Sequence, residues 1–101
     1  MTAHVTWRQR FRADAREITG YYADRGGPEL AARFIHALET AVYRIAHSPD
    51  SGSPLAQEYG IPGLRSYAMA EFPFAIFYLH SDDAVALVRV LHGRRDFTSL
   101  L

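Results

Sequence analysis

The segment FPFAIFYLHSDDAVALVRVLH, residues 72–92, decides the fold. It consists of two apolar runs, Phe72 to His80 and Ala84 to His92, joined by three polar residues that are typical of a β-hairpin turn. Phe74 to Leu79 is apolar at both alternating positions, which predicts a central strand covered on both faces. A third run rich in aromatic and branched residues, Leu64 to Ala70, precedes the pair and extends the predicted antiparallel sheet.

Helical periodicity occupies the first half of the chain. Apolar residues recur on one helical face over residues 7–24 and, on a wider face, over residues 28–47. Gly26-Gly27-Pro28 separates the two helices, because glycine permits a tight turn and proline suits a first helical turn. A short strand, Met1 to Val5, is expected before them. The predicted fold class is α+β, one domain over residues 1–101 in which an N-terminal strand precedes an antiparallel helical hairpin packed on a small antiparallel β-sheet.

Composition excludes several kinds of chemistry. The 101 residues contain no cysteine and no lysine, so all the fixed positive charge is guanidinium. The absence of cysteine rules out disulfides, thiolate metal sites and a cysteine nucleophile, and the absence of lysine rules out a Schiff base and a P-loop. The 11 arginines balance 11 acids, so net charge gives no long-range attraction to nucleic acid. Since the sequence has no signal-peptide or membrane-spanning pattern, we expect a cytoplasmic chain with no membrane partner.

The end of the last predicted strand gathers cationic and titratable side chains. Arg89, His92, Arg94 and Arg95 fall within seven residues. Guanidinium groups bind phosphate and carboxylate bidentately, so this cluster could hold a nucleic-acid backbone or an acidic protein surface. Arg94 and Arg95 could instead form weak surface ion pairs with neighbouring acids. Arg89 lies among apolar strand residues, where a buried charge needs a partner.

Arg65 is a second candidate for anion binding. It lies on the first strand of the three-stranded unit, and Tyr67 shares its face. Antiparallel neighbours could bring Arg65 near Arg89, and two converging guanidiniums would need an anion or a carboxylate between them. The alternative is a structural ion pair between Arg65 and Glu58 or Glu71.

The first predicted helix has a row of like charges. Arginines at i, i+4 and i+8 repel one another and, in the first turn, oppose the helix dipole, so an acidic partner would stabilise them. Asp14 is expected to pair with Arg10 within the helix, which leaves this row to solvent, to the chain's own acids or to another chain. The residues expected on this surface are Trp7, Arg8, Arg12, Arg16 and Tyr21.

A catalytic interpretation rests on His92, which is the candidate general base because arginines surround it in the sequence. The residues that an RNA-cleaving site would combine are His92, Arg65, Arg89 and Tyr67. His36 and Glu39 lie at i and i+3 on a helix, but one such pair is too few ligands for a metal site. We therefore expect no metal and no cofactor.

The chain resembles the ParE side of the RelE/ParE superfamily of bacterial type II toxins over nearly its whole length. The most specific segments are Gly63-Leu64-Arg65, Phe72 to Tyr78 and Val88 to Asp96. The fold that this resemblance implies, a helical hairpin against an antiparallel sheet, agrees with the fold predicted from periodicity. The resemblance further implies a toxin encoded beside a cognate ParD-like or other antitoxin that binds its surface, as in plasmid stabilisation systems.

The resemblance implies a binding function first and a catalytic one second. ParE-like toxins poison DNA gyrase by binding, which makes Arg65, Arg89, Arg94 and Arg95 the candidate target-binding residues and the first helix the candidate antitoxin surface. RelE-like relatives are ribosome-dependent endoribonucleases that cut mRNA, and this alternative would use the His92 set. The lysines and the terminal His-Tyr pair of some ribonuclease members are absent, which favours the binding function. A third alternative is a chain retained only as a partner for its antitoxin.

Overall fold

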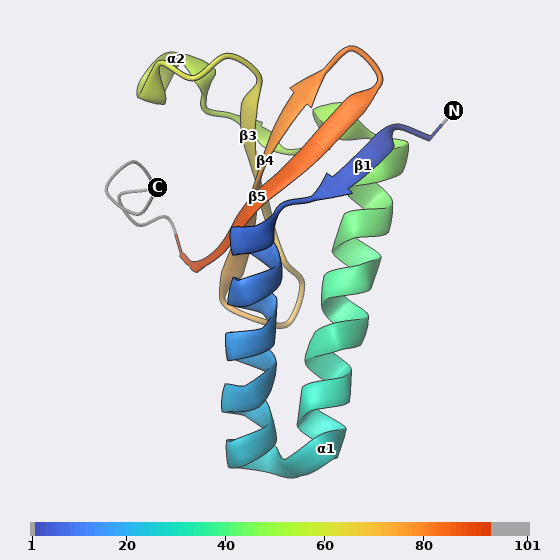
Figure 1. The fold of residues 1–101 in the computed structure, drawn as a ribbon, viewed down its shortest axis with the longest axis vertical. Helices are drawn as coiled ribbons and strands as arrows, with labels where there is room; N and C mark the ends of the chain where they lie inside the picture. The colour runs from blue at the N-terminus through green and yellow to red at the C-terminus, as the bar shows by residue number, and fades with distance from the viewer. Residues whose placement is uncertain (1, 94–101) are drawn as a thin grey trace.

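The structure is a computed structural model that describes residues 2–93. Its elements are, in chain order, β1 (His4–Trp7), α1 (Gln9–His47), the 3-10 helix η1 (Pro49–Ser51), β2 (Ser53–Pro54), α2 (Ala56–Tyr59), β3 (Leu64–Ala68), β4 (Phe74–Ser81) and β5 (Ala84–His92). The two arms of α1 lie side by side, and their connection lies beyond one end of the sheet (Figure 1). This is the predicted α+β architecture.

α1 consists of two helices that meet at a kink and form a helical hairpin. Gly27 has non-helical backbone angles (φ 75°, ψ −174°), and Pro28 follows it at the start of the second arm. A positive φ is accessible to glycine without steric cost, and proline has no N–H to leave unpaired in a first turn. The prediction of two helices separated at Gly26-Gly27-Pro28 is therefore confirmed.

The sheet has five strands in the order β1-β5-β4-β3-β2, with β4 at its centre. The β2–β3, β3–β4 and β4–β5 pairs are antiparallel, as predicted, but β1 pairs with β5 in parallel. The expectation of a purely antiparallel sheet is thus wrong for this pair. Parallel pairing is possible because the whole helical hairpin and three strands separate β1 from β5, which leaves ample chain for a crossover. β1 also starts later than the expected Met1 to Val5.

Both faces of the sheet are covered. On the hairpin side, Ile76 and Tyr78 of β4 pack with Phe11 and Phe34 of α1. On the opposite side, Phe77 packs with other buried side chains that include Leu55 and Leu64. The prediction that Phe74 to Leu79 forms a central strand covered on both faces is confirmed. No helix within residues 2–93 is long and apolar enough to cross a membrane.

Candidate functional site

Arg89 is bound by a carboxylate from the first arm of α1. Its Nε donates to Oδ2 of Asp14 at 2.8 Å and its Nη2 donates to Oδ1 at 2.9 Å. The backbone N–H of Val90 donates to the same Oδ2 at 3.0 Å. The two side chains are only 10% and 13% exposed, and the hydrogen bonds to Asp14 raise the pKa of Arg89 against the opposing effect of burial. Arg89 thus has the partner that a buried charge requires.

The identity of that partner corrects the sequence analysis, which paired Asp14 with Arg10. β1 ends at Trp7, opposite Leu87, so β5 continues beyond its parallel neighbour. The first turns of α1 run past this part of β5, and Asp14 reaches it from there. The two residues are 75 positions apart in the sequence, so helical spacing alone cannot reveal the pair.

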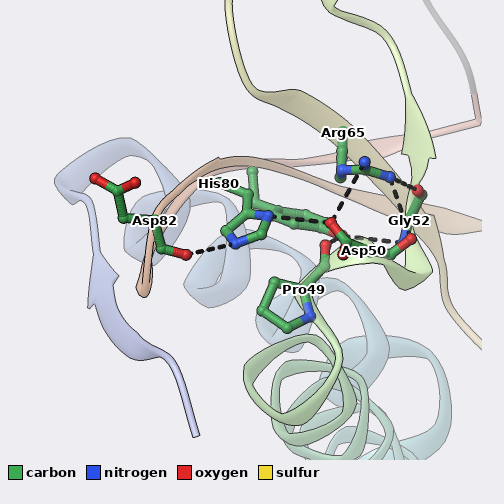
Figure 2. Close-up of polar contacts among 7 residues, drawn as sticks. Pro49, Asp50, Gly52, Arg65, His80 and Asp82 are labelled. Carbon is green, nitrogen blue, oxygen red and sulfur yellow. Dashed lines mark hydrogen bonds and ion pairs between the residues drawn. The ribbon is translucent and has the colours of Figure 1, made fainter.

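Arg65 belongs to a second polar cluster, between β3 and the segment that follows α1 (Figure 2). Its Nη1 donates to the carbonyl oxygens of Asp50 at 3.1 Å and Gly52 at 2.7 Å, and its Nη2 lies 3.5 Å from the Asp50 carboxylate. Asp50 therefore takes the place of Glu58 or Glu71, the expected partners. Glu71 lies 3.7 Å from Arg33, which is at the surface of the second arm.

Two residues of the neighbouring strand β4, Tyr78 and His80, also bind the segment that follows α1. The Tyr78 hydroxyl donates to the carbonyl oxygen of Pro49 at 2.6 Å and accepts from the N–H of Gly52 at 3.0 Å. Burial is the main reason that the pKa of Tyr78 is raised, although the Gly52 amide and Arg65 oppose it. His80 contacts the Asp50 carboxylate through Nδ1 at 3.4 Å and the Asp82 carbonyl oxygen through Nε2 at 2.9 Å (Figure 2). This cluster holds the segment against the sheet.

The structure does not bring Arg65 and Arg89 together. β4 lies between their strands, and their partners on it are Tyr78 for Arg65 and Phe77 for Arg89. Adjacent strand residues point to opposite faces, and each arginine is bound by its own acid. The predicted convergence of the two guanidiniums is therefore wrong.

The residues of the RNA-cleaving alternative are also spread out. Tyr67 lies beside Arg65 on β3, whereas His92 pairs with Phe74 at the far end of β5 and packs its ring edge-on against that side chain at 5.4 Å. Four residues of β4 separate the levels of Arg65 and His92, which is about 13 Å along the strand and about 10 Å across two strand spacings. These side chains do not share one site in the described chain.

The surface predicted for the antitoxin is in part a real groove. Trp7 is half-buried, packs edge-on against Phe11 at 5.2 Å, and accepts a hydrogen bond from Arg12 Nε on its carbonyl oxygen at 3.1 Å. The groove between the two arms of α1 has a volume of about 580 Å³ and is lined by Trp7, Ala15, Arg16, Thr19, Gly20, Ile35, Leu38 and Glu39. Arg8, Arg12 and Arg16 are exposed along the first arm.

Tyr21 does not line this groove. It is 49% exposed, and the guanidinium of Arg25 lies 4.3 Å from its ring centroid. It lines a separate pocket, next to the start of β4 and His92. Arg94 and Arg95 lie outside the described residues. Within residues 2–93 no group of three or more His, Asp or Glu side chains is suited to hold a metal ion.

Sequence reasoning missed Asp14 as the partner of Arg89, and it missed Asp50, Tyr78 and His80 altogether. The only signal in the sequence was Arg89 itself, because a charge within an apolar strand predicts that some acid must reach it. Nothing in the sequence names that acid.

The structure is a small α+β domain with two arginine–aspartate pairs. A solved structure from P. aeruginosa, the chromosomal ParDE TA system, shares the fold with a TM-score of 0.76 and 19% identity, over 92% of this chain and 98% of that one.

The family follows from the sequence itself. The profile of the family described as ParE toxin of type II toxin-antitoxin system, parDE, matches residues 5–97, and the chain belongs to that family. A curated relative is 31% identical over 97 residues, which is 96% of this chain and 95% of the relative. This relative is Y4kP of Sinorhizobium fredii (strain NBRC 101917 / NGR234), a protein that is provisionally named a toxin.

Proposed function

We propose that this ParE-family toxin arrests growth by binding DNA gyrase, with no chemistry of its own, and that a cognate antitoxin neutralises it. The observation behind a binding mechanism is that Arg65 and Arg89 are already bound by acids, with Asp50 beside the first and Asp14 on the second. A guanidinium bound in this way orders the backbone around it and has less charge to offer a reacting phosphate. Family membership supports the toxin part of the proposal.

Arg94 and Arg95 are the proposed contacts with the target. They directly follow Gly93, one residue beyond β5. Two adjacent guanidiniums can each bind a carboxylate or phosphate bidentately, which gives both affinity and orientation. Arg65 and Arg89 contribute indirectly, by holding β3 and β5 in place through Asp50 and Asp14.

The test measures inhibition of supercoiling by purified gyrase with the toxin and with a variant that has Arg94→Ala and Arg95→Ala. We expect the variant to be at least about tenfold less potent, since hot-spot arginines at interfaces typically contribute more than 1 kcal/mol each. The matched control has Arg33→Ala and Arg44→Ala, which remove the same charge from exposed positions on the second arm of α1. Equal potency of the tail variant and the wild type would contradict the proposal.

The proposed antitoxin segment is an amphipathic helix with acidic residues along one edge. Its apolar face would fill the groove lined by Trp7, Ile35 and Leu38. Its acids would pair with Arg16, which lines the groove, and with the exposed Arg8, which follows Trp7 in the sequence. Charge complementarity of this kind sets specificity and association rate and weakens as salt is added.

Antitoxin binding is tested with Arg8→Glu combined with Arg16→Glu. We expect an increase in Kd of roughly 100-fold at low salt that shrinks at high salt. The control reverses the charge of Arg33 and Arg44 in the same way. A Kd within about threefold of the wild type would place the antitoxin elsewhere.

The endoribonuclease alternative makes the opposite prediction at one residue. It requires His92 to act together with Arg65 and Arg89, which belong to separate clusters. If the chain cuts ribosome-bound mRNA, His92→Ala abolishes the cleavage. If it binds gyrase, the same substitution leaves supercoiling inhibition in place.

A further inference from the structure

Gly20 lies inside the first arm of α1, where a glycine weakens the helix. Glycine has more backbone freedom to lose than alanine, so it is less favourable in a helix interior. Gly20 is exposed and is not among the glycines with a positive φ. Apart from its chain neighbours and its own helix backbone, no atom of residues 2–93 would lie within 4 Å of a Cβ added to it. The fold of the free chain therefore has room for alanine at this position.

Of the seven glycines in the sequence, all but Gly20 have a structural reason. Four have a positive φ, which alanine adopts only with strain. In two others, a Cβ would collide with the side chain of Leu30 or Tyr78. The first group is Gly27, Gly60, Gly63 and Gly93, and the second is Gly26 and Gly52. Gly20 alone has no such reason in the described chain.

Gly20 lines the groove between the two arms of α1. The first arm contributes the small side chains of Ala15 and Thr19 beside it, and the second arm contributes Ile35 and Leu38. The Thr19 hydroxyl donates to the Ala15 carbonyl oxygen at 2.7 Å, so its hydrogen bond is made within the helix. On the opposite wall, Ile35 leaves 41% of its surface exposed. One wall is thus low and the other offers apolar surface, which suits the apolar face of a helix.

The length and the charges of the groove define its occupant further. Ala15 to Gly20 covers about 8 Å along the helix axis, or about one and a half turns. A partner helix that crosses this length places two apolar side chains, at i and i+3 or i+4, in the groove. Arg16 lines the first wall and Glu39 the second, and both are exposed. A partner helix with an acid on one edge and a basic residue on the other would match both charges.

We infer that Gly20 is the point at which the antitoxin helix approaches the first arm most closely. Packed helix axes lie about 8–10 Å apart, depending on the side chains at the contact, and a glycine permits the closest approach. A side chain at residue 20 would push the partner helix away from Ile35 and Leu38 on the opposite wall. This inference rests on the proposed neutralisation by an antitoxin helix in this groove.

The test compares Gly20→Ala and Gly20→Met with Thr40→Ala and Thr40→Met. All four substitutions introduce a better helix former. Thr40 is exposed on the second arm and lines a different pocket, with Arg44 and Tyr67. The Thr40 variants therefore strengthen the helix and add the same side chains outside the groove, which makes them matched controls.

Thermal midpoints and Kd are measured on each purified full-length protein, and the probe is the purified antitoxin encoded beside this chain. We expect the midpoint to rise by roughly 3–6 °C in both Gly20 variants, because a better helix former enters open space. We expect Kd to increase about tenfold for Gly20→Ala and at least about 100-fold for Gly20→Met. The Thr40 variants are expected to raise the midpoint by roughly 2–4 °C and to keep Kd within about threefold of the wild type. A glycine that served only the free fold would not give higher stability together with weaker binding.

Two results would overturn the inference. One is a Kd of Gly20→Met within about threefold of the wild type. The other is a midpoint of Gly20→Ala below that of the wild type, because the free fold would then require the glycine.

The combined variant Arg8→Glu and Arg16→Glu distinguishes this failure from that of the proposed antitoxin site. If it binds weakly while Gly20→Met binds normally, the antitoxin uses the first arm without a close approach at Gly20, and only the inference fails. If both bind normally, the groove is not the antitoxin site, and both proposals fail. A wild-type dimer that Gly20→Met converts to monomers in sedimentation, with antitoxin Kd unchanged, would assign the groove to a second copy of the chain and overturn the inference.

Discussion

Replacing Tyr78 by Phe removes one oxygen from the centre of the polar cluster and nothing else. The ring is fully buried and stays in place, so the hydrophobic packing is preserved. The hydroxyl accounts for two hydrogen bonds, one to the Pro49 carbonyl oxygen at 2.6 Å and one from the Gly52 N–H at 3.0 Å. The bond from the Gly52 N–H is buried and the bond to the Pro49 carbonyl oxygen is partly buried, so solvent replaces at most part of what the hydroxyl supplies.

The cost follows from the two backbone groups that lose their partner. An unsatisfied buried donor or acceptor costs about 1–3 kcal/mol, so Tyr78→Phe is expected to lower the free energy of unfolding by about 2–4 kcal/mol. For a domain of this size, the thermal midpoint falls by roughly 10–25 °C. Urea unfolding and thermal melts followed by circular dichroism measure both quantities.

Tyr43→Phe is the matched control, because Tyr43 is 62% exposed and loses the same oxygen at the surface. It is expected to change stability by no more than about 0.5 kcal/mol. If Tyr78→Phe were as stable as this control, the two hydrogen bonds would not hold the segment after α1, and the account of the cluster would be refuted.

Three further predictions concern single residues. Gly63→Ala is expected to lower the free energy of unfolding in urea by about 3 kcal/mol, because the φ of Gly63 is 79° and a Cβ would collide with the carbonyl oxygen of His80. Gly60→Ala is expected to lower it by about 1 kcal/mol, because Gly60 has a similar φ of 67° but open space around a Cβ. Equal losses in the two variants would contradict the collision. Burial raises the pKa of Tyr78 above the usual 10.0, so its contribution to the free energy of unfolding is present below pH 10 and is lost as the pH rises through the pKa of the folded state. Unfolding measured at alkaline pH should show this loss in the wild type and less of it in Tyr78→Phe, and equal losses in the two proteins would argue against it. Arg33→Ala is expected to have a stability within about 0.5 kcal/mol of the wild type in thermal melts, because the ion pair of Arg33 with Glu71 is 3.7 Å long and exposed. A larger loss would mean that this surface ion pair stabilises the fold.

The features that the sequence predicted are those set by local chemistry. Neighbouring residues determine the break between the helices at Gly27 and Pro28. They also determine the run of β4 that is apolar on both faces. The parallel pairing of β1 with β5 was missed because it depends on where the whole helical hairpin returns the chain. The two-residue strand β2, half of which is proline, has no periodicity from which it could be recognised.

The candidate site shows the same division. That Arg89 needs a partner follows from its apolar neighbours, but the choice of Asp14 depends on β1 ending opposite Leu87, where the first turns of α1 reach the rest of β5. Likewise, Arg65 meets Asp50 because the segment after α1 folds back over β3. These contacts join residues far apart in the sequence, so neither residue type nor local spacing predicts them.

The central claim, that the chain is a toxin acting on DNA gyrase by binding, is tested most directly by pulse-labelling DNA and protein synthesis within minutes of inducing the chain alone in a bacterial host. The account predicts that DNA synthesis stops first and that a DNA-damage reporter responds. If protein synthesis stopped first while DNA stayed intact, the claim would be contradicted, and His92, Arg65 and Arg89 would have to be tested as a ribonuclease site.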